Sequence, residues 1–78
     1  MDAEIDKLYA TVDRFSIAMK HKLLEKHHAG YRGWDDPTEK IYICDKLSQS
    51  TKDLVNGDQS KAVNVANLAM FLHFMMQK

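Results

Sequence analysis

The segment from Ala62 to Met76 is almost entirely apolar, and only Asn64, Asn67 and His73 interrupt it. A helix that is apolar on every side must be covered on every side, because water disfavours each exposed apolar face. A chain of 78 residues has only two further helices with which to cover it. The segment therefore predicts a helical bundle that is completed by homo-oligomerisation, as a dimer or a higher oligomer, through this helix. The expected interface residues are Phe71, Phe74, Met75 and Met76.

Hydrophobic periodicity predicts a first helix over residues 2–28, which contain neither glycine nor proline. Its apolar residues recur every three or four positions and form one stripe. The stripe consists of Ile5, Leu8, Val12, Phe15, Met19 and Leu23.

A second helix is expected from Thr38, as its N-cap, to Val55. Its inward positions are predicted to be Ile43, Cys44, Leu47, Leu54 and Val55. The third helix should begin at Gln59, because Gly57 suits a helix C-terminus and Asp58 suits an N-cap. The expected fold is a single all-α domain, residues 1–78, with three helices.

Composition excludes several classes of protein. Eleven Lys and Arg balance eleven Asp and Glu, and this lack of basic excess argues against a general nucleic-acid-binding protein. No apolar run reaches the roughly 18 residues of a membrane span, and no apolar segment follows the acidic first residues as in a signal peptide. A cytoplasmic protein is expected. The single cysteine, Cys44, leaves no intramolecular disulfide and no paired-cysteine zinc site.

Catalytic motifs are absent from the sequence. The four histidines form neither HExxH nor H-x3-H, so His21, His27 and His28 read as surface residues, and His73 as an interface or core residue. Cys44 has no basic neighbour in sequence that would activate it, which favours a buried structural role. No phosphate-binding glycine loop and no GxSxG element occurs.

The loop from Ala29 to Pro37 is unusually rich in side chains that bind nucleotides. Tyr31 and Trp34 offer flat aromatic faces, and Arg32 can stack or bind phosphate. Lys22 and Lys26 stand on the helix that enters the loop. Alternatively, Trp34 only closes the open end of the bundle. Asn64 and Asn67, on one face of the apolar helix, need hydrogen-bond partners from a ligand or from a subunit interface.

Three segments together carry a family resemblance. They are Phe15-Ser-Ile-Ala-Met19-Lys-His-Lys22-Leu23, Gly30-Tyr-Arg-Gly-Trp34-Asp and Asn64-Val-Ala-Asn67-Leu-Ala-Met70. In this order they resemble the MazG-like all-α nucleotide pyrophosphohydrolases, above all the short phage-encoded members. The resemblance implies a dimeric or tetrameric helical bundle that binds nucleoside triphosphates. It also implies cleavage of the α–β phosphate bond with Mg²⁺, held by ExxE on one helix and ExxD on the next.

The family's Mg²⁺ ligands are mostly replaced in this chain. The ExxD positions correspond to Lys61 and Asn64, and the ExxE positions to Ser50 and Asp53, so that only Asp53 keeps a carboxylate. Mg²⁺ prefers carboxylate oxygens, and an ammonium group and an amide in their place leave little reason for it to bind. The resemblance then implies a degenerate metal site, without cofactor, in a protein that holds a nucleotide and does not hydrolyse it.

The leading hypothesis is therefore a non-catalytic nucleotide-binding protein of MazG-like fold. By family context it would be a phage anti-defence sponge that sequesters a cyclic dinucleotide or a related signal. One alternative is a Mg²⁺-dependent pyrophosphohydrolase that uses Asp45, Asp53 or Asp58, and another is a protein–protein adaptor that uses the Met- and Phe-rich end. The predicted ligand-binding residues are Lys22, Lys26, Tyr31, Arg32, Trp34, Lys61, Asn64 and Asn67.

Overall fold

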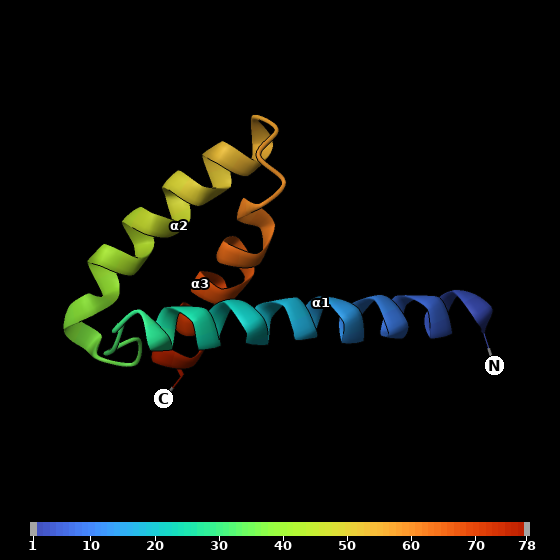
Figure 1. Ribbon diagram of the computed structural model, residues 1–78, viewed down its shortest axis with the longest axis horizontal. Helices are drawn as coiled ribbons and strands as arrows, with labels where there is room; N and C mark the ends of the chain where they lie inside the picture. The colour runs from blue at the N-terminus through green and yellow to red at the C-terminus, as the bar shows by residue number, and fades with distance from the viewer. Residues whose placement is uncertain (1, 78) are drawn as a thin grey trace.

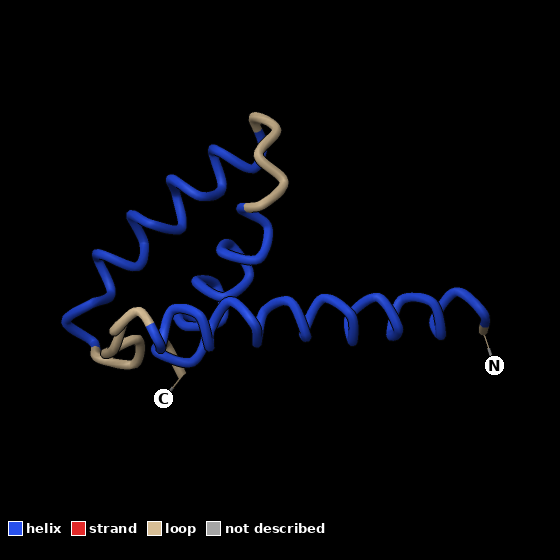
Figure 2. The backbone as a smooth tube through the Cα atoms, viewed as in Figure 1, coloured by secondary structure: helices blue, strands red, loops and turns tan. Residues whose placement is uncertain are grey.

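A computed structural model describes residues 2–77 as three α-helices and one short 3-10 helix, without a strand in that range (Figures 1 and 2). The helices are α1 (Ala3–His28), α2 (Lys40–Val55) and α3 (Lys61–Met75), and the 3-10 turn η1 (Pro37–Glu39) precedes α2. The all-α prediction is confirmed. The two end positions of the predicted 1–78 domain lie outside the described residues.

The first helix begins and ends at residues whose chemistry suits those positions. The Asp2 carboxylate accepts a hydrogen bond from the Glu4 backbone N–H at 2.9 Å, which satisfies one of the free donors at the helix start. Basic side chains occupy the last turn, where they oppose the negative end of the helix dipole. The helix stops before Gly30, whose φ of +97° is unfavourable for other residues. The predicted first helix is confirmed.

The start of the second helix differs from the prediction. Thr38 is not the N-cap: Asp36 caps the 3-10 turn η1, where its carboxylate accepts hydrogen bonds from the Thr38 N–H and hydroxyl at 2.9 and 2.8 Å. Glu39 occupies the N-cap position of α2 and makes no side-chain capping bond. Pro37 supplies the first residue of the turn, because its fixed φ suits the first position of a helix. The chain therefore forms a 3-10 turn over residues 37–39 before α2 begins.

The connection to α3 is a tight turn centred on Gly57, which has a φ of +111°. Asp58 then accepts hydrogen bonds from the Ser60 N–H and hydroxyl. Asp58 thus stabilises the turn before the helix, and α3 itself begins two residues later than predicted, at Lys61.

The helices form an open arrangement (Figure 1). Few of the described residues are buried. Helix α2 runs back along α3, and α1 crosses α3 with its C-terminal half, while its N-terminal half extends past both. The radius of gyration is 14.2 Å, against about 11.5 Å for a compact domain of this length. Among the described residues, Ile43 is the only buried apolar side chain.

Two predicted burials are wrong. Cys44 and Val55 are exposed, because they lie about 90° and 110° around α2 from the centre of its inward face. That face consists of Ile43, Leu47, Ser50 and Leu54. His73 is exposed and is therefore not a core residue of the single chain, while its place at a subunit interface stays a prediction.

The C-terminal end of α3 keeps part of its apolar surface open. Phe74 and Met76 are exposed, Met75 is half-buried, and Phe71 packs against Trp34. Self-association through this helix stays a prediction. Within residues 2–77, no helix combines the length and the apolar character needed to cross a membrane.

Candidate functional site

A cleft of about 760 Å³ lies between the C-terminal half of α1, the following loop, α2 and α3. Each element contributes one face to it. From α1 and the loop come Lys22, Leu23, Leu24, Lys26, His27, Tyr31, Arg32, Gly33 and Trp34. From η1, α2 and α3 come Glu39, Tyr42, Ile43, Lys46, Gln49, Ser50, Asp53, Lys61, Asn64, Asn67, Leu68, Met70 and Phe71.

Positive charge is concentrated in this cleft. Five lysines and arginines line it against two carboxylates, whereas the whole chain carries no net charge. The five are Lys22, Lys26, Arg32, Lys46 and Lys61. They come from all three helices and from the loop, so the fold itself gathers them. An excess of cations in a concave site with apolar walls attracts anionic ligands.

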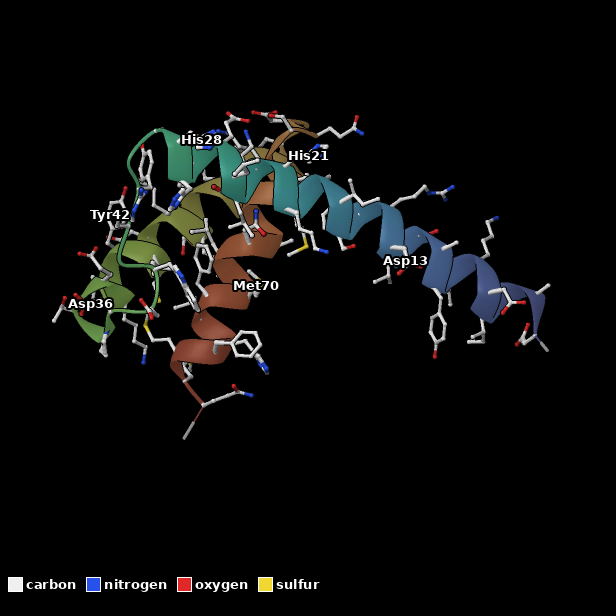
Figure 3. All side chains as sticks on the ribbon, turned by 60° about the horizontal axis from the view of Figure 1, so that its bottom comes forward. Asp13, His21, His28, Asp36, Tyr42 and Met70 are labelled. Atoms are coloured by element: carbon white, nitrogen blue, oxygen red, sulfur yellow. The ribbon has the colours of Figure 1, made fainter. Side chains whose placement is uncertain are left out.

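Aromatic rings occupy the end of the cleft near the loop. Trp34 stacks on Phe71 with ring centroids 5.2 Å apart and an angle of 29° between the rings. Trp34 nevertheless keeps 46% of its surface exposed at the edge of the cleft. Tyr31 lies under the Lys26 ammonium at 4.9 Å, and Tyr42, labelled in Figure 3, lies under that of Lys46 at 5.5 Å. Packing against Phe71 also agrees with the simpler interpretation, that Trp34 closes the end of the bundle.

Arg32 is already partly engaged within the chain. Its Nη1 donates to the backbone carbonyls of His27 and Tyr31, both at 2.8 Å. The guanidinium therefore satisfies a carbonyl of the last turn of α1, where helix ends lack partners. Its other donors are not used by this contact.

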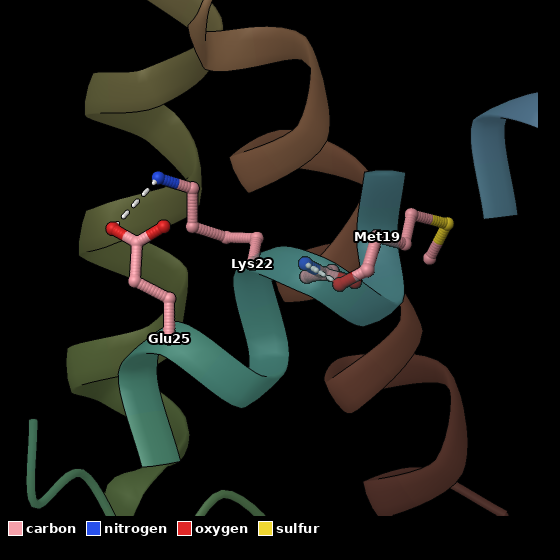
Figure 4. A network of polar contacts seen from close by, with 4 residues as sticks. Met19, Lys22 and Glu25 are labelled. Atoms are coloured by element: carbon pink, nitrogen blue, oxygen red, sulfur yellow. Dashed lines mark hydrogen bonds and ion pairs between the residues drawn. The ribbon is translucent and has the colours of Figure 1, made fainter. Parts of the chain in front are cut away.

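The two asparagines of α3 lie at different depths. Asn67 is 4% exposed, and its Nδ2 donates to the carbonyl of Met19 at 3.3 Å, which ties α3 to α1 (Figure 4). The hydrogen-bond partner of the Asn67 amide group is therefore a carbonyl of the same chain, whereas the sequence suggested a ligand or a second subunit. Its Oδ1, in contrast, is buried without a hydrogen-bond partner. Asn64 is half-buried and lines the cleft.

The four positions to which the MazG-like resemblance would assign Mg²⁺ ligands all line the cleft. Ser50 and Asp53 come from α2, and Lys61 and Asn64 come from α3. Asp53, the only carboxylate among them, accepts a hydrogen bond from Gln49 Nε2 at 3.0 Å. In residues 2–77, no three His, Cys, Asp or Glu side chains gather closely enough to hold a metal ion. This donor set does not fit Mg²⁺.

All eight residues predicted to bind a ligand line this one cleft, although they lie up to 45 positions apart in the sequence, from Lys22 to Asn67. The sequence did not indicate Tyr42 or Lys46 as cleft residues, and it predicted Phe71 at a subunit interface, whereas Phe71 lines the cleft and stacks on Trp34 within the chain. A signal for the first two exists: Tyr42, Lys46, Gln49 and Asp53 repeat every three or four residues and share one face of α2. Phe71 could not be identified in this way, because its partner Trp34 comes from a distant loop.

Comparisons of the chain with protein-family models, with curated proteins and with solved structures give no match.

Proposed function

We propose that this protein binds a nucleotide in the cleft without hydrolysing it. The observation that carries the proposal is the excess of three positive charges in a cleft that is also lined by the partly exposed Trp34. Nucleotides combine an anionic phosphate chain with a flat base. Cationic side chains beside an aromatic ring are suited to bind both parts. The MazG-like resemblance of the sequence supports the same class of ligand, and it remains part of the proposal.

In the proposed complex the base stacks beside Trp34, and the phosphates extend toward Lys61. Phe71, which holds Trp34, and Lys61 are ten residues apart on α3, or about 15 Å along the helix axis. Asn64 lies between them on the same helix and can donate or accept hydrogen bonds. Ammonium groups bind phosphate oxygens without a metal, and their affinity decreases as salt screens the charges.

Absence of hydrolysis is proposed from the donor set of the cleft. At the positions implied for Mg²⁺, only Asp53 offers a carboxylate, and Lys61 brings a positive charge to the site. The positive charge of the Lys61 ammonium group repels a divalent cation. In the proposed complex, Lys61 therefore binds the phosphate oxygens that a metal ion would otherwise bind.

The test is calorimetric titration of the purified chain with ATP and with a cyclic dinucleotide, first in EDTA and then with Mg²⁺. Chromatography of each mixture afterwards measures how much ligand remains intact. The proposal expects binding in EDTA with full recovery of the ligand. Breakdown that occurs only with Mg²⁺ would favour the pyrophosphohydrolase alternative, and absence of heat with every nucleotide would refute the proposal.

Matched variants locate the binding. Lys61→Ala and Trp34→Leu are each expected to weaken binding by about 1–3 kcal/mol, through a lost charged hydrogen bond or a lost stacking contact. Lys52→Ala removes the same charge from α2 outside the cleft and should leave the affinity within about 0.5 kcal/mol of the original. Equal effects of Lys61→Ala and Lys52→Ala would show that binding depends only on net charge.

A further inference from the structure

Asn67 of α3 is a buried polar side chain that lines the cleft, and only one end of its amide is satisfied. Its Nδ2 donates to the Met19 carbonyl at 3.3 Å, whereas its Oδ1 is buried without a hydrogen-bond partner among the described residues. A buried acceptor without a partner is costly, and native proteins contain few of them. An unpartnered oxygen on a side chain of a cleft therefore points to a ligand that supplies the missing donor.

The bond to Met19 fixes the chemistry that this ligand must bring. If the amide were turned over, its Oδ1 would face the Met19 carbonyl oxygen, and two acceptors would meet. The Nδ2 is therefore held on the Met19 side, and the Oδ1 is a fixed acceptor. An acceptor pairs only with an N–H or O–H group, so an ionised phosphate oxygen does not bind there. The donors of a nucleotide are the hydroxyls of its ribose and the N–H groups of its base.

The position of Asn67 along α3 selects between these donors. Phe71, which holds Trp34, follows Asn67 by four residues, or about 6 Å along the helix axis. Lys61 precedes Asn67 by six residues, or about 9 Å. In the complex proposed above, the base lies beside Trp34 and the phosphates extend toward Lys61. Asn67 is then level with the sugar that joins them.

We propose that the Asn67 Oδ1 accepts a hydrogen bond from a ribose hydroxyl, so that the cleft recognises the sugar of its ligand. This inference rests on the proposed nucleotide binding. Solvent does not reach the Oδ1 in the free chain, so the cost of removing water from it is present before a ligand arrives. A hydroxyl that pairs with this oxygen gains a bond without that further cost, which favours strong discrimination against a sugar that lacks the hydroxyl.

The ligand reaches the Oδ1 after a small shift of side chains in the wall of the cleft. That wall includes Lys22 and Lys26, whose side chains are long and flexible. Their ammonium groups can follow the phosphates as the ligand enters, since ammonium groups bind phosphate oxygens.

The first test is calorimetric titration of the unmodified full chain in EDTA with ATP and with 2′,3′-dideoxyATP. The two ligands have the same base and phosphates, and the second lacks both hydroxyls. ATP is expected to bind about tenfold more tightly, which is the effect of one hydrogen bond to a buried acceptor. One of 2′-deoxyATP and 3′-deoxyATP should show the same loss and so identify the hydroxyl. Inosine triphosphate keeps the ribose and lacks the adenine amine, and it should bind like ATP.

Asn67→Leu tests whether this side chain is the acceptor. Leucine occupies a similar volume and cannot accept a hydrogen bond, so the variant should bind ATP and dideoxyATP equally. Asn56→Leu changes the same residue type at the exposed C-cap of α2, outside the cleft, and should keep the tenfold preference seen in the unmodified chain, about the size expected for one buried hydrogen bond. Circular dichroism checks that both variants keep their helix content. In the unmodified chain, NMR signals of the Asn67 side-chain amide should shift more with ATP than with dideoxyATP, which needs no substitution.

The outcomes separate this inference from the proposed function. Equal binding of ATP and dideoxyATP to the unmodified chain, or a preference for ATP that persists in Asn67→Leu, would overturn the role of Asn67 and leave nucleotide binding intact. A loss of affinity with inosine triphosphate alone would assign the Oδ1 to the base amine and would also overturn recognition of the sugar. Absence of binding by every nucleotide would refute the proposed function, and this inference with it.

Discussion

The two halves of α1 carry one continuous apolar stripe and yet meet very different surroundings. In the C-terminal half, Met19 and Leu23 are half-buried, and Asn67 of α3 donates a hydrogen bond to the Met19 carbonyl. In the N-terminal half, Leu8 and Val12 of the same stripe are more than half exposed. Hydrophobic periodicity therefore indicates which face of a helix is to be covered. It does not indicate which element or molecule covers that face.

The two halves also differ in charge and in what they offer chemically. The C-terminal half contributes Lys22 and Lys26 to the cleft, whereas no residue of the N-terminal half, residues 3–16, lines it. The proposed binding of a nucleotide therefore involves only the C-terminal half of the helix.

Truncation of the stripe in each half should give the largest difference. Leu23→Ala is expected to lower the free energy of unfolding by about 1–3 kcal/mol, because it removes packed atoms at a half-buried position. Leu8→Ala should lower it by less than about 0.5 kcal/mol, because Leu8 is more than half exposed and contacts few other side chains. Urea unfolding measures both. Equal costs would mean that the two halves of α1 are packed alike, and the comparison would fail.

The hydrogen bond from Asn67 comes next in size. Asn67→Ala should lower the free energy of unfolding by about 1 kcal/mol, since it removes the bond to the Met19 carbonyl. Asn67→Leu should cost less than Asn67→Ala, because leucine fills the space and removes the unpartnered Oδ1. If Asn67→Ala unfolds at the same urea concentration as the original chain, this bond does not hold the C-terminal half of α1 in place.

A smaller effect is expected from the ion pair between Lys22 and Glu25, 3.5 Å apart on the packed half (Figure 4). Glu25 is mostly exposed, so Glu25→Gln should change the free energy of unfolding by less than about 0.5 kcal/mol. The same substitution frees the Lys22 ammonium for the cleft, and nucleotide affinity should rise slightly at low salt. A loss of affinity in calorimetry would show that Glu25 instead supports the site.

The smallest effect concerns the turn that follows the packed half. Hydrogen bonds from the Thr38 backbone N–H and then its hydroxyl lower the pKa of Asp36 below its ordinary value of 3.8. Because the folded pKa is the lower one, the stabilisation is present above about pH 4 and is lost as pH falls through the folded pKa. NMR titration should find this low pKa, and Thr38→Val should raise it. An unchanged pKa in Thr38→Val would assign the whole shift to the backbone donor.

Local sequence was sufficient for much of the fold. The three helices follow from period, glycine and capping residues, and Gly57 takes the positive φ that its predicted position requires. The capping error at Thr38 could have been avoided, because Pro37 at the first helical position indicates Asp36 as the cap. Cys44 and Val55 were assigned inward on apolar character alone, although their angular positions on α2 lie off the inward face.

The candidate site was only partly predictable. Residue type indicated the aromatic and basic members, and the structure brings them into one cleft. The contact between Trp34 and Phe71 and that between Met19 and Asn67 depend on how α1 and the loop meet α3, which is tertiary packing that no local pattern specifies. The exposure of the N-terminal half of α1 was not foreseen for the same reason, since its stripe continues that of the packed half.

The most direct test of the central claim is a two-dimensional NMR titration of the labelled full chain with a nucleotide in EDTA. The account predicts that the Trp34 indole N–H and the Asn64 side-chain amide shift with increasing nucleotide, while the backbone amides of Leu8 and Val12 remain unchanged. Shifts confined to the N-terminal half of α1, or no shift at either cleft residue at saturating nucleotide, would contradict it.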